Sequence, residues 1–149
     1  MIEVVSALII KNGRVLLTQR PADKDQPFHW ETPGGKVEGP HESHHSALQR
    51  ELYEELGLER VSVAEQCWWS SEIAWNVIDR RTREDVPREV FLLIYPVLAY
   101  QGIPKPLEGQ GLGWFGYNDI SYLTLNLGNQ KCAQMMIHEV MDRRLEIKS

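Results

Sequence analysis

Cysteine is scarce in this chain, and the two that occur, Cys67 and Cys132, lie far apart and match no metal-binding spacing. Reduced thiols in a cytoplasmic protein are therefore the expected state, and a disulfide between them is the alternative. The chain also has no uninterrupted apolar run close to the roughly 20 residues that a membrane-spanning helix needs. Its first residues include no positively charged leader and no small-residue cleavage site, so we expect no signal peptide.

Basic residues are fewer than acidic ones, which argues against a nucleic acid polymer as a partner. Lysine and arginine number 16 and aspartate and glutamate 21, so the formal net charge is −5 at pH 7. A protein that binds a nucleic acid polymer needs clustered lysine and arginine to follow the phosphate backbone. A small phosphorylated substrate that is handled through metal ions is compatible with the acidic balance.

Internal repeats, low-complexity segments and domain linkers are also absent from the sequence. The chain has 149 residues, of which 42% are apolar and 25% charged, as in an ordinary globular protein large enough for a core. We therefore predict a single domain over residues 1–149, present as a monomer or a homodimer.

What the chain does contain is a concentration of carboxylates between residues 50 and 58. Glu51, Glu54 and Glu55 are three and four positions apart, a spacing that places side chains on one face of a helix. A neighbouring stripe that can pack against a sheet consists of Leu48, Leu52 and Leu56. Like charges at this spacing repel by about a few tenths of a kcal/mol per exposed pair. A purely structural helix gains nothing from that repulsion, whereas a divalent cation would turn it into binding.

The stretch from Gly34 to Leu58 resembles the Nudix box, in which a glycine is followed after five residues by a glutamate. Seven residues later the box continues as Arg-Glu-apolar-any-Glu-Glu-any-Gly-apolar. From Glu42 onward the match is complete, since seven residues lead to Arg50 and every later fixed position is present. Upstream the chain departs from the pattern, because six residues instead of five separate Gly35 from Glu42. The loop between them is therefore expected to carry one extra residue.

The resemblance implies an α/β fold, in the form of an α/β/α sandwich with a mixed β-sheet between helices. It also implies a metal-dependent hydrolase that cleaves the phosphoanhydride of a nucleoside diphosphate linked to another group. Mg²⁺ or Mn²⁺ is the implied cofactor, because hard cations prefer oxygen ligands. The implied metal ligands are the carbonyl of Gly34 and the carboxylates of Glu51, Glu54, Glu55 and Glu108.

For the remaining catalytic roles, the resemblance leaves alternatives open. Either Glu51 or Glu54 is the base for the attacking water, and Arg50 has an orienting role. Glu42 either bears on the metal or holds the loop through Arg50. Lys36 either contacts phosphate or is an exposed loop lysine. The histidines of this stretch offer no convincing tetrahedral zinc site, and they are His41, His44 and His45.

Within the family the chain is most similar to the MutT branch, which hydrolyses nucleoside triphosphates, oxidised guanine nucleotides among them. The match implies substrate contacts from Arg20, Arg88 and Asn129. Alternatively the two arginines are surface charges, and Asn129 is the N-cap of the last helix. Thr32 and Gly128 depart from the branch, since they replace an aromatic residue and an aspartate that contact the base.

The segment from Gln66 to Pro87 looks longer than the MutT branch needs. It contains Trp68, Trp69 and Trp75, which either rebuild the base pocket or belong to the core. Three functions follow in order of preference. The first is hydrolysis of a (d)NTP, including oxidised purine nucleotides, to the monophosphate and pyrophosphate. The second is a nucleotide-sugar or dinucleotide pyrophosphatase, and the third is a non-catalytic nucleotide sensor.

Local patterns predict the elements that surround the box. β-branched runs at 4–10 and 15–19 flank the turn signal Asn12-Gly13 and predict two strands. A helix is expected over about 43–56, with Ser43 as N-cap and Gly57 as its stop. After the box, one or two strands are expected over 60–75 and a hairpin tip or mobile loop over 79–88. A central strand is expected over 90–98, with its pairing interrupted near Pro96, followed by a loop over 102–113 and a short strand at 114–115. An irregular connector over 121–128 and a helix over about 130–144 complete the chain.

Overall fold

A computed structural model describes residues 1–148, and it places two β-sheets between helices. The larger sheet has the order β5-β1-β8-β6, with β7 also paired to β8, and the smaller sheet has the order β2-β3-β4, with β9 paired to β3. The elements are β1 Ile2–Leu8, β2 Ile10–Lys11, β3 Arg14–Gln19, β4 Trp30–Glu31, β5 Gly34–Lys36, α1 His44–Leu56, β6 Glu59–Val63, β7 Trp69–Ile78, β8 Asp85–Gln101, β9 Gly111–Phe115, α2 Tyr117–Ile120 and α3 Leu127–Asp142.

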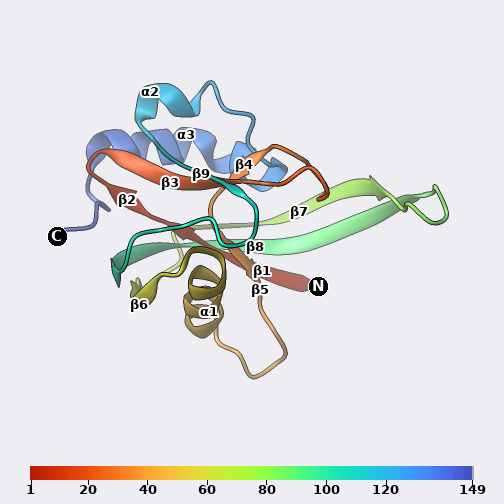
Figure 1. The fold of residues 1–149 in the computed structure, drawn as a ribbon, viewed down its shortest axis with the longest axis horizontal. Coiled ribbons are helices and arrows are strands. Elements are labelled where there is room, and N and C mark those ends of the chain that lie inside the picture. The colour runs from red at the N-terminus through yellow and green to blue at the C-terminus, as the bar shows by residue number, and fades with distance from the viewer. Residues whose placement is uncertain (149) are drawn as a thin grey trace.

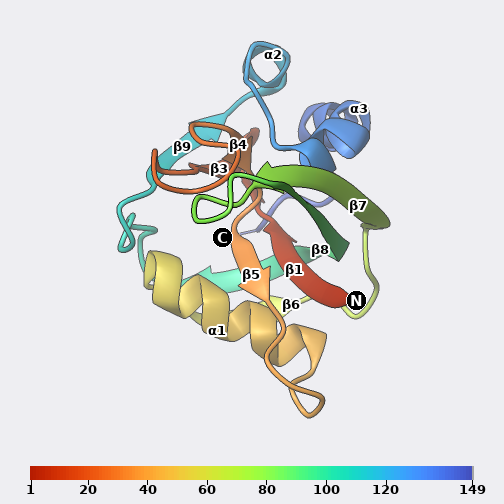
Figure 2. The same cartoon turned by 90° about the vertical axis from the view of Figure 1, so that its right-hand side faces the viewer.

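Helices cover the larger sheet from both sides, as the predicted α/β/α sandwich requires (Figures 1 and 2). The sheet is mixed, because β1 runs parallel to β8 and antiparallel to β5. Alternate residues of β1 point to opposite faces, and they contribute to two separate buried clusters. The cluster on the α1 side includes Val5, Ala7, Leu48, Leu52 and Leu56. The cluster on the α3 side includes Ile73, Leu92, Ile94, Met136 and Val140.

The box helix α1 begins and ends where the sequence predicts. Ser43 is the N-cap, and its side chain accepts a hydrogen bond from the Ser46 backbone N–H. At the other end Gly57 adopts φ 72°, a left-handed conformation that glycine reaches without steric cost. The backbone N–H groups of Gly57 and Leu58 then bond to the carbonyls of Tyr53 and Leu52, which ends the helix in a Schellman-type turn.

The long strand β8 extends beyond the predicted range of 90–98 at both ends. Its partner on one edge changes beside Pro96, since β7 pairs as far as Ile94 and β6 takes over at Val97. The predicted interruption near Pro96 is therefore a change of partner, which suits a residue that has no N–H to donate. The predicted 79–88 connector is a hairpin tip only up to Glu84, because residues 85–88 already belong to β8.

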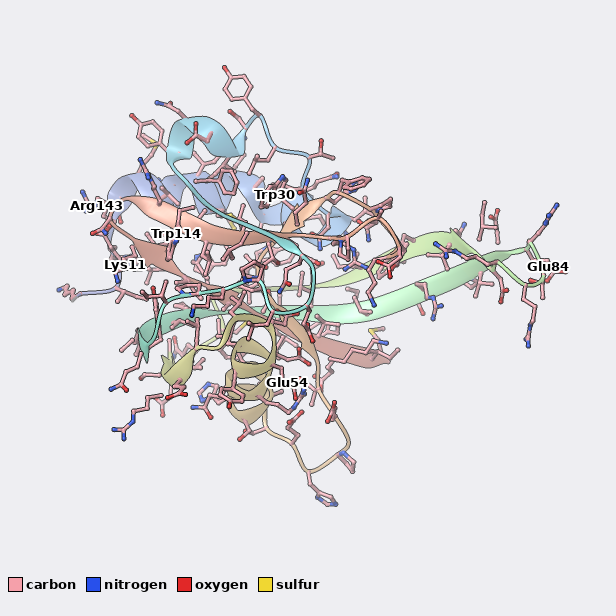
Figure 3. The ribbon with its side chains drawn as sticks, in the orientation of Figure 1. Lys11, Trp30, Glu54, Glu84, Trp114 and Arg143 are labelled. Carbon is pink, nitrogen blue, oxygen red and sulfur yellow. The ribbon has the colours of Figure 1, made fainter. Side chains whose placement is uncertain are left out.

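β7 and β8 continue past the end of β1 as a two-stranded ribbon. We call residues 74–89 the β7–β8 ribbon, because β1 pairs with β8 only from Val90 onward. The ribbon projects from the body of the protein, with Glu84 at its tip (Figure 3). Much of the segment from Gln66 to Pro87 therefore lies in this ribbon.

The closing helix α3 begins earlier than expected. Asn126 is its N-cap and accepts a hydrogen bond from the Asn129 backbone N–H, so the alternative role of Asn129 as N-cap is wrong. Residues 117–120 form a short helix that the sequence pattern did not predict. Both cysteines are free, as expected. No helix within residues 1–148 combines the length and apolar character needed to cross a membrane.

Candidate active site

A cavity of about 1420 Å³ opens between the β7–β8 ribbon, β1 and the loop after β3. One end reaches Glu31, Gly34, Gly35 and Lys36, and the other runs along the ribbon. All four predicted substrate residues contribute to its lining, and they are Arg20, Lys36, Arg88 and Asn129. The structure therefore gathers residues from four separate segments around one space.

The carboxylates of α1 lie next to this cavity at Gly34 and Gly35, which we call the glycine pair. Gly35 lies against Glu51 so closely that an added Cβ would stand 2.3 Å from the Glu51 carboxyl carbon. An added Cβ on Gly34 would stand 2.0 Å from the Val5 carbonyl oxygen. Gly34 therefore requires glycine, because a side chain there would push β5 away from β1, and a side chain at Gly35 would displace the Glu51 carboxylate. The glycine pair thus separates the cavity from the helix by a single layer of backbone.

Glu55 is the most unusual of the box carboxylates. Its Oε2 atom is buried and has no hydrogen-bond partner among the described residues. Burial, together with the negative charges of Glu51, Glu31 and Glu108, raises the pKa of Glu55 from 4.5 to about 9, against a backbone hydrogen bond at Gly34. A buried carboxylate without a partner is costly, because the charged form loses its hydration. At neutral pH the metal-free site therefore favours the protonated form of Glu55, and a cation would favour the carboxylate.

The loop that carries Glu108 is anchored on the last turn of α1. The backbone N–H of Leu107 and the side chain of Gln110 both donate to the carbonyl oxygen of Glu55, at 3.0 and 3.1 Å. Gln110 in turn accepts from the backbone N–H of Glu108 at 2.8 Å. These bonds satisfy a carbonyl that the helix leaves open at its end. They also fix an exposed carboxylate, that of Glu108, beside Glu51 and Glu55.

Arg50 binds the surrounding carboxylates together. Its guanidinium contacts both oxygens of Glu42 at 2.8 and 3.0 Å and Glu51 Oε1 at 2.9 Å. It also reaches Glu54 Oε2 at 3.3 Å and the Lys36 carbonyl at 3.0 Å. Of the two roles open for Glu42, the structure therefore shows the one in which it holds the loop through Arg50. Burial raises the pKa of Glu51, while Arg50 acts in the opposite direction.

The Glu42 carboxylate gives a prediction for acid stability. Hydrogen bonds from Arg50 and then from the Glu38 backbone N–H lower the pKa of Glu42 from 4.5 to about 2. A lowered pKa contributes stability that is present above about pH 4.5 and is lost as the pH falls toward 2. We expect the melting temperature of the wild type to fall more steeply over this range than that of Glu42→Gln. Glu65→Gln, at an exposed site, is the control, and equal slopes for wild type and Glu42→Gln would contradict the prediction.

Glu31 is a site residue that the sequence reasoning missed. It lies on β4, lines the cavity and accepts from Arg20 at 2.9 and 3.3 Å. Arg20 also donates to the Asp25 side chain at 2.7 Å and to its carbonyl at 2.6 Å, so it is held between two carboxylates. The available signal was a glutamate two residues before Pro33, in the loop that leads to the glycine pair.

Asn129 lies on the cavity with its amide already engaged. Its Oδ1 accepts from the Thr32 backbone N–H at 3.2 Å, and its Nδ2 donates to Thr32 Oγ1 at 3.1 Å. Thr32 is bonded to Ser6 as well, at 2.7 Å, and all three side chains are buried. The network ties α3 to β4 and β1. The base contacts predicted for Asn129 and Arg88 stay predictions, as does the phosphate contact of Lys36, and Arg88 and Lys36 are exposed at the rim.

Within residues 1–148, the one group whose ligand atoms all lie within 4.8 Å of one another is His138, Glu139 and Asp142, near the end of α3. Glu139 there is already paired with Arg144, at 3.3 Å. The box carboxylates stand farther apart, because like charges repel and Arg50 draws Glu51 and Glu54 to itself. His44 contacts Tyr95 at 2.9 Å and Glu3 at 3.2 Å.

Comparison with known proteins decides the family. The model of the NUDIX domain matches residues 2–136, which is most of the chain. The chain belongs to the Nudix hydrolase family. It is similar to the CTP pyrophosphohydrolase of Escherichia coli (strain K12), with 42% identity over 114 residues that cover 76% of this chain and 75% of that protein.

Solved structures agree with the assignment of this chain to the Nudix hydrolase family. The solution structure of the Escherichia coli ORF135 protein is 32% identical, with a TM-score of 0.73, and the match covers 97% of this chain and 94% of that one. A MutT structure from a study of the Aliivibrio salmonicida and Vibrio cholerae proteins is 25% identical, with a TM-score of 0.66 and coverage of 93% and 98%. The predicted family, its MutT-like fold and the assignment as a hydrolase are confirmed.

Nudix hydrolases generally use a divalent metal ion, and the donor set of this chain fits one. The fit rests on Glu55, whose buried Oε2 has no partner and whose pKa is raised to about 9. Carboxylates and backbone carbonyls are the oxygen donors that hard cations prefer. A cation beside Glu55, Glu51 and Glu108 would give the buried carboxylate the counter-charge that the described residues do not supply.

Proposed function

We propose that this Nudix hydrolase converts nucleoside triphosphates to the monophosphate and pyrophosphate with Mg²⁺, or Mn²⁺, as cofactor. The observation that carries the proposal is the unpartnered Glu55 carboxylate, which lies beside Glu51 and Glu108 and one backbone layer from a cavity of nucleotide size. A phosphoanhydride is slow to react because its oxygens repel an incoming nucleophile. The arrangement offers what this reaction needs, namely charge neutralisation and a fixed position for the water.

The chain's own residues divide the work as follows. Glu51, Glu54, Glu55, Glu108 and the carbonyl of Gly34 would hold the metal, which when bound supplies charge neutralisation and makes a water more acidic. Glu51 or Glu54 accepts the proton of the attacking water at a carboxylate oxygen. Arg50 orients Glu51 through its 2.9 Å contact and acts against the burial that raises the pKa of Glu51. The glycine pair lets the phosphate chain approach the backbone, and Lys36 at the rim contacts the phosphates.

Cytidine triphosphates are the first substrates to test. A relative with 42% identity is named as a CTP pyrophosphohydrolase, and the match covers most of both chains. Thr32 and Gly128 stand where the MutT branch uses an aromatic residue and an aspartate on a purine, which argues against recognition specific to purines. We propose that the base and ribose contact Arg20, Arg88 and Asn129, since all three line the cavity.

The deciding experiment is a nucleotide panel with product analysis. CTP, dCTP, the other triphosphates and 8-oxo-dGTP are incubated with Mg²⁺, and the products are separated by ion-exchange chromatography. We expect a monophosphate and pyrophosphate in equal amounts, and no activity in EDTA. Release of orthophosphate and a diphosphate would contradict the proposed position of cleavage. His138→Ala, on the second carboxylate cluster, is the matched control and should keep full activity.

The length of the cavity favours a second candidate. At about 1420 Å³ it exceeds the ordinary pocket range of about 300–1,000 Å³, and it continues along the β7–β8 ribbon. A nucleotide-sugar or dinucleotide would use that additional space. Two products that each carry a monophosphate, with no free pyrophosphate, would identify this activity in the same assay.

A further inference from the structure

One aromatic side chain faces the cavity. Among the described residues that line it, Trp75 alone is aromatic. Trp75 lies on β7 opposite Arg88, at the base of the β7–β8 ribbon. It is half-buried and packs against the apolar cluster on the α3 side, while it also contributes to the cavity wall. The indole therefore has a packed side and a side toward the cavity.

Hydrogen bonds fix the direction of this indole. Its Nε1–H donates to Asp25 Oδ2 at 3.2 Å, across the mouth of the cavity. Asp25 is held in turn by Arg20, whose Nη2 lies 2.7 Å from Asp25 Oδ1, and Arg20 is held by Glu31. The chain of contacts runs from the ribbon to β4. A ring that is locked in place before binding loses little conformational freedom when a ligand stacks on it.

The floor beside Trp75 suits a flat, apolar ring. Ile73, Val90 and Leu92 line the cavity on the same side, and Gly128 contributes no side chain. Thr32 offers neither an aromatic surface nor a free hydroxyl, because Ser6 and Asn129 already bond to it. Polar groups gather at the opposite edge, on Arg20 and Glu31. The cavity thus combines one stacking surface, an apolar floor and a polar edge.

We infer that the nucleobase of the substrate stacks on Trp75, and that Asp25 is the positioning residue that holds the indole in place. The inference rests on the proposed function and adds the means by which the base is bound. Stacking tolerates any base, since every base has a π face. Trp75 therefore sets the affinity for nucleotides as a class, and the choice among bases falls to the polar edge.

Trp75→Leu tests this inference against a matched control, Trp69→Leu. Trp69 lies on the same strand and packs against the same apolar cluster, but it does not line the cavity. We expect Trp75→Leu to raise KM for the best nucleotide about 10- to 100-fold, with kcat within about twofold of wild type. The inhibition constant of methylenediphosphonate, which has no base, should stay unchanged. Trp69→Leu should lower the melting temperature and leave KM and the inhibition constant of methylenediphosphonate unchanged.

Further variants keep the test decisive if Trp75→Leu does not fold. Trp75→Phe retains a stacking ring without the N–H, so its KM should rise only several-fold, as in Asp25→Ala, and far less than in Trp75→Leu. Asp25→Ala should raise KM several-fold, and Asp25→Asn, which keeps an oxygen for the indole N–H, should recover most of that loss. An unchanged KM in both Trp75→Leu and Asp25→Ala would overturn the inference. So would equal effects on the nucleotide and on methylenediphosphonate.

Binding with Ca²⁺ in place of the active metal separates this inference from the proposed function. The tryptophan fluorescence of the wild type should be quenched by a nucleoside triphosphate, and Trp75→Phe should lose most of that quenching. If nucleotides are hydrolysed but quenching and KM ignore Trp75, the inference alone fails. If quenching depends on Trp75 but no nucleotide is hydrolysed, the proposed function alone fails.

Discussion

Replacing Glu55 with glutamine will lower kcat by about 100-fold or more, and it will also make the metal-free protein more stable at neutral pH. The two effects have one cause. The Oε2 atom of Glu55 is buried without a partner, and burial next to Glu51, Glu31 and Glu108 raises its pKa to about 9. A cation turns that unfavourable charge into a binding site. Without a cation, Glu55 has to take up a proton when the protein folds at neutral pH, which opposes folding.

The pH dependence follows from the direction of this shift. A carboxyl whose folded pKa lies above its ordinary value of 4.5 has its stability contribution fully present below about pH 4.5. That contribution is lost as the pH rises toward 9. In EDTA, we therefore expect the free energy of unfolding of the wild type to fall by about 2–3 kcal/mol more than that of Glu55→Gln between pH 5 and pH 8. Urea unfolding at several pH values measures the difference.

Glu54→Gln is the matched control for this prediction. Half of the Glu54 side chain is exposed, so its carboxylate keeps most of its hydration. We expect this variant to lose activity as a metal ligand does, but to change the metal-free stability by no more than about 0.5 kcal/mol. Parallel stability curves for wild type and Glu55→Gln would show that the buried carboxylate carries no penalty. Full activity of both variants would refute the metal site itself.

Elements that depend on neighbouring residues were predictable from the sequence. The helix α1 has its N-cap, its apolar stripe and its left-handed stop within one short segment, so local physics determines its ends. The same holds for the turn at Asn12-Gly13 and for the change of partner near Pro96. In each case a side chain or a missing N–H limits the backbone without help from distant parts of the chain.

Contacts between distant segments were not predictable in the same way. Asn129 looked like a helix cap or a base contact, but it is buried against Thr32, 97 positions away. Glu31 carries no pattern of its own, and it becomes part of the site only because β4 places it beside Arg20 and near Glu55. Trp75 could be core or pocket on sequence alone. In the structure it packs against the apolar cluster on the α3 side and also lines the cavity.

The remaining difference from the family pattern, the extra residue between Gly35 and Glu42, is explained by Arg50. The loop returns to the helix through Glu42, which binds Arg50 with both oxygens and also accepts from the Glu38 backbone N–H. Arg50 holds the start of the same loop through the Lys36 carbonyl. The loop therefore lies between two ends that Arg50 holds, and Gly35 lies directly against the Glu51 carboxylate.

Arg50→Lys should therefore lower kcat by about 100-fold, although it preserves the charge. A guanidinium can bond to Glu42, Glu51 and the Lys36 carbonyl at once because its donors form a planar fork, whereas an ammonium is a compact point charge. With lysine, the Glu51 carboxylate loses its fixed orientation and the loop loses one of its ends. Hydrogen exchange of residues 36–42 should become faster in the variant, in step with the loss of activity.

Arg144→Lys provides the control, because Arg144 also binds a buried glutamate, Glu139, but at the far end of α3. Its kcat and the exchange of residues 36–42 should match wild type. If Arg50→Lys kept wild-type kcat while the loop exchanged faster, Arg50 would hold the loop without orienting Glu51. If kcat fell with no change in exchange, Arg50 would orient Glu51 without holding the loop. Only a joint change supports the interpretation that one guanidinium sets both the loop and the catalytic carboxylate.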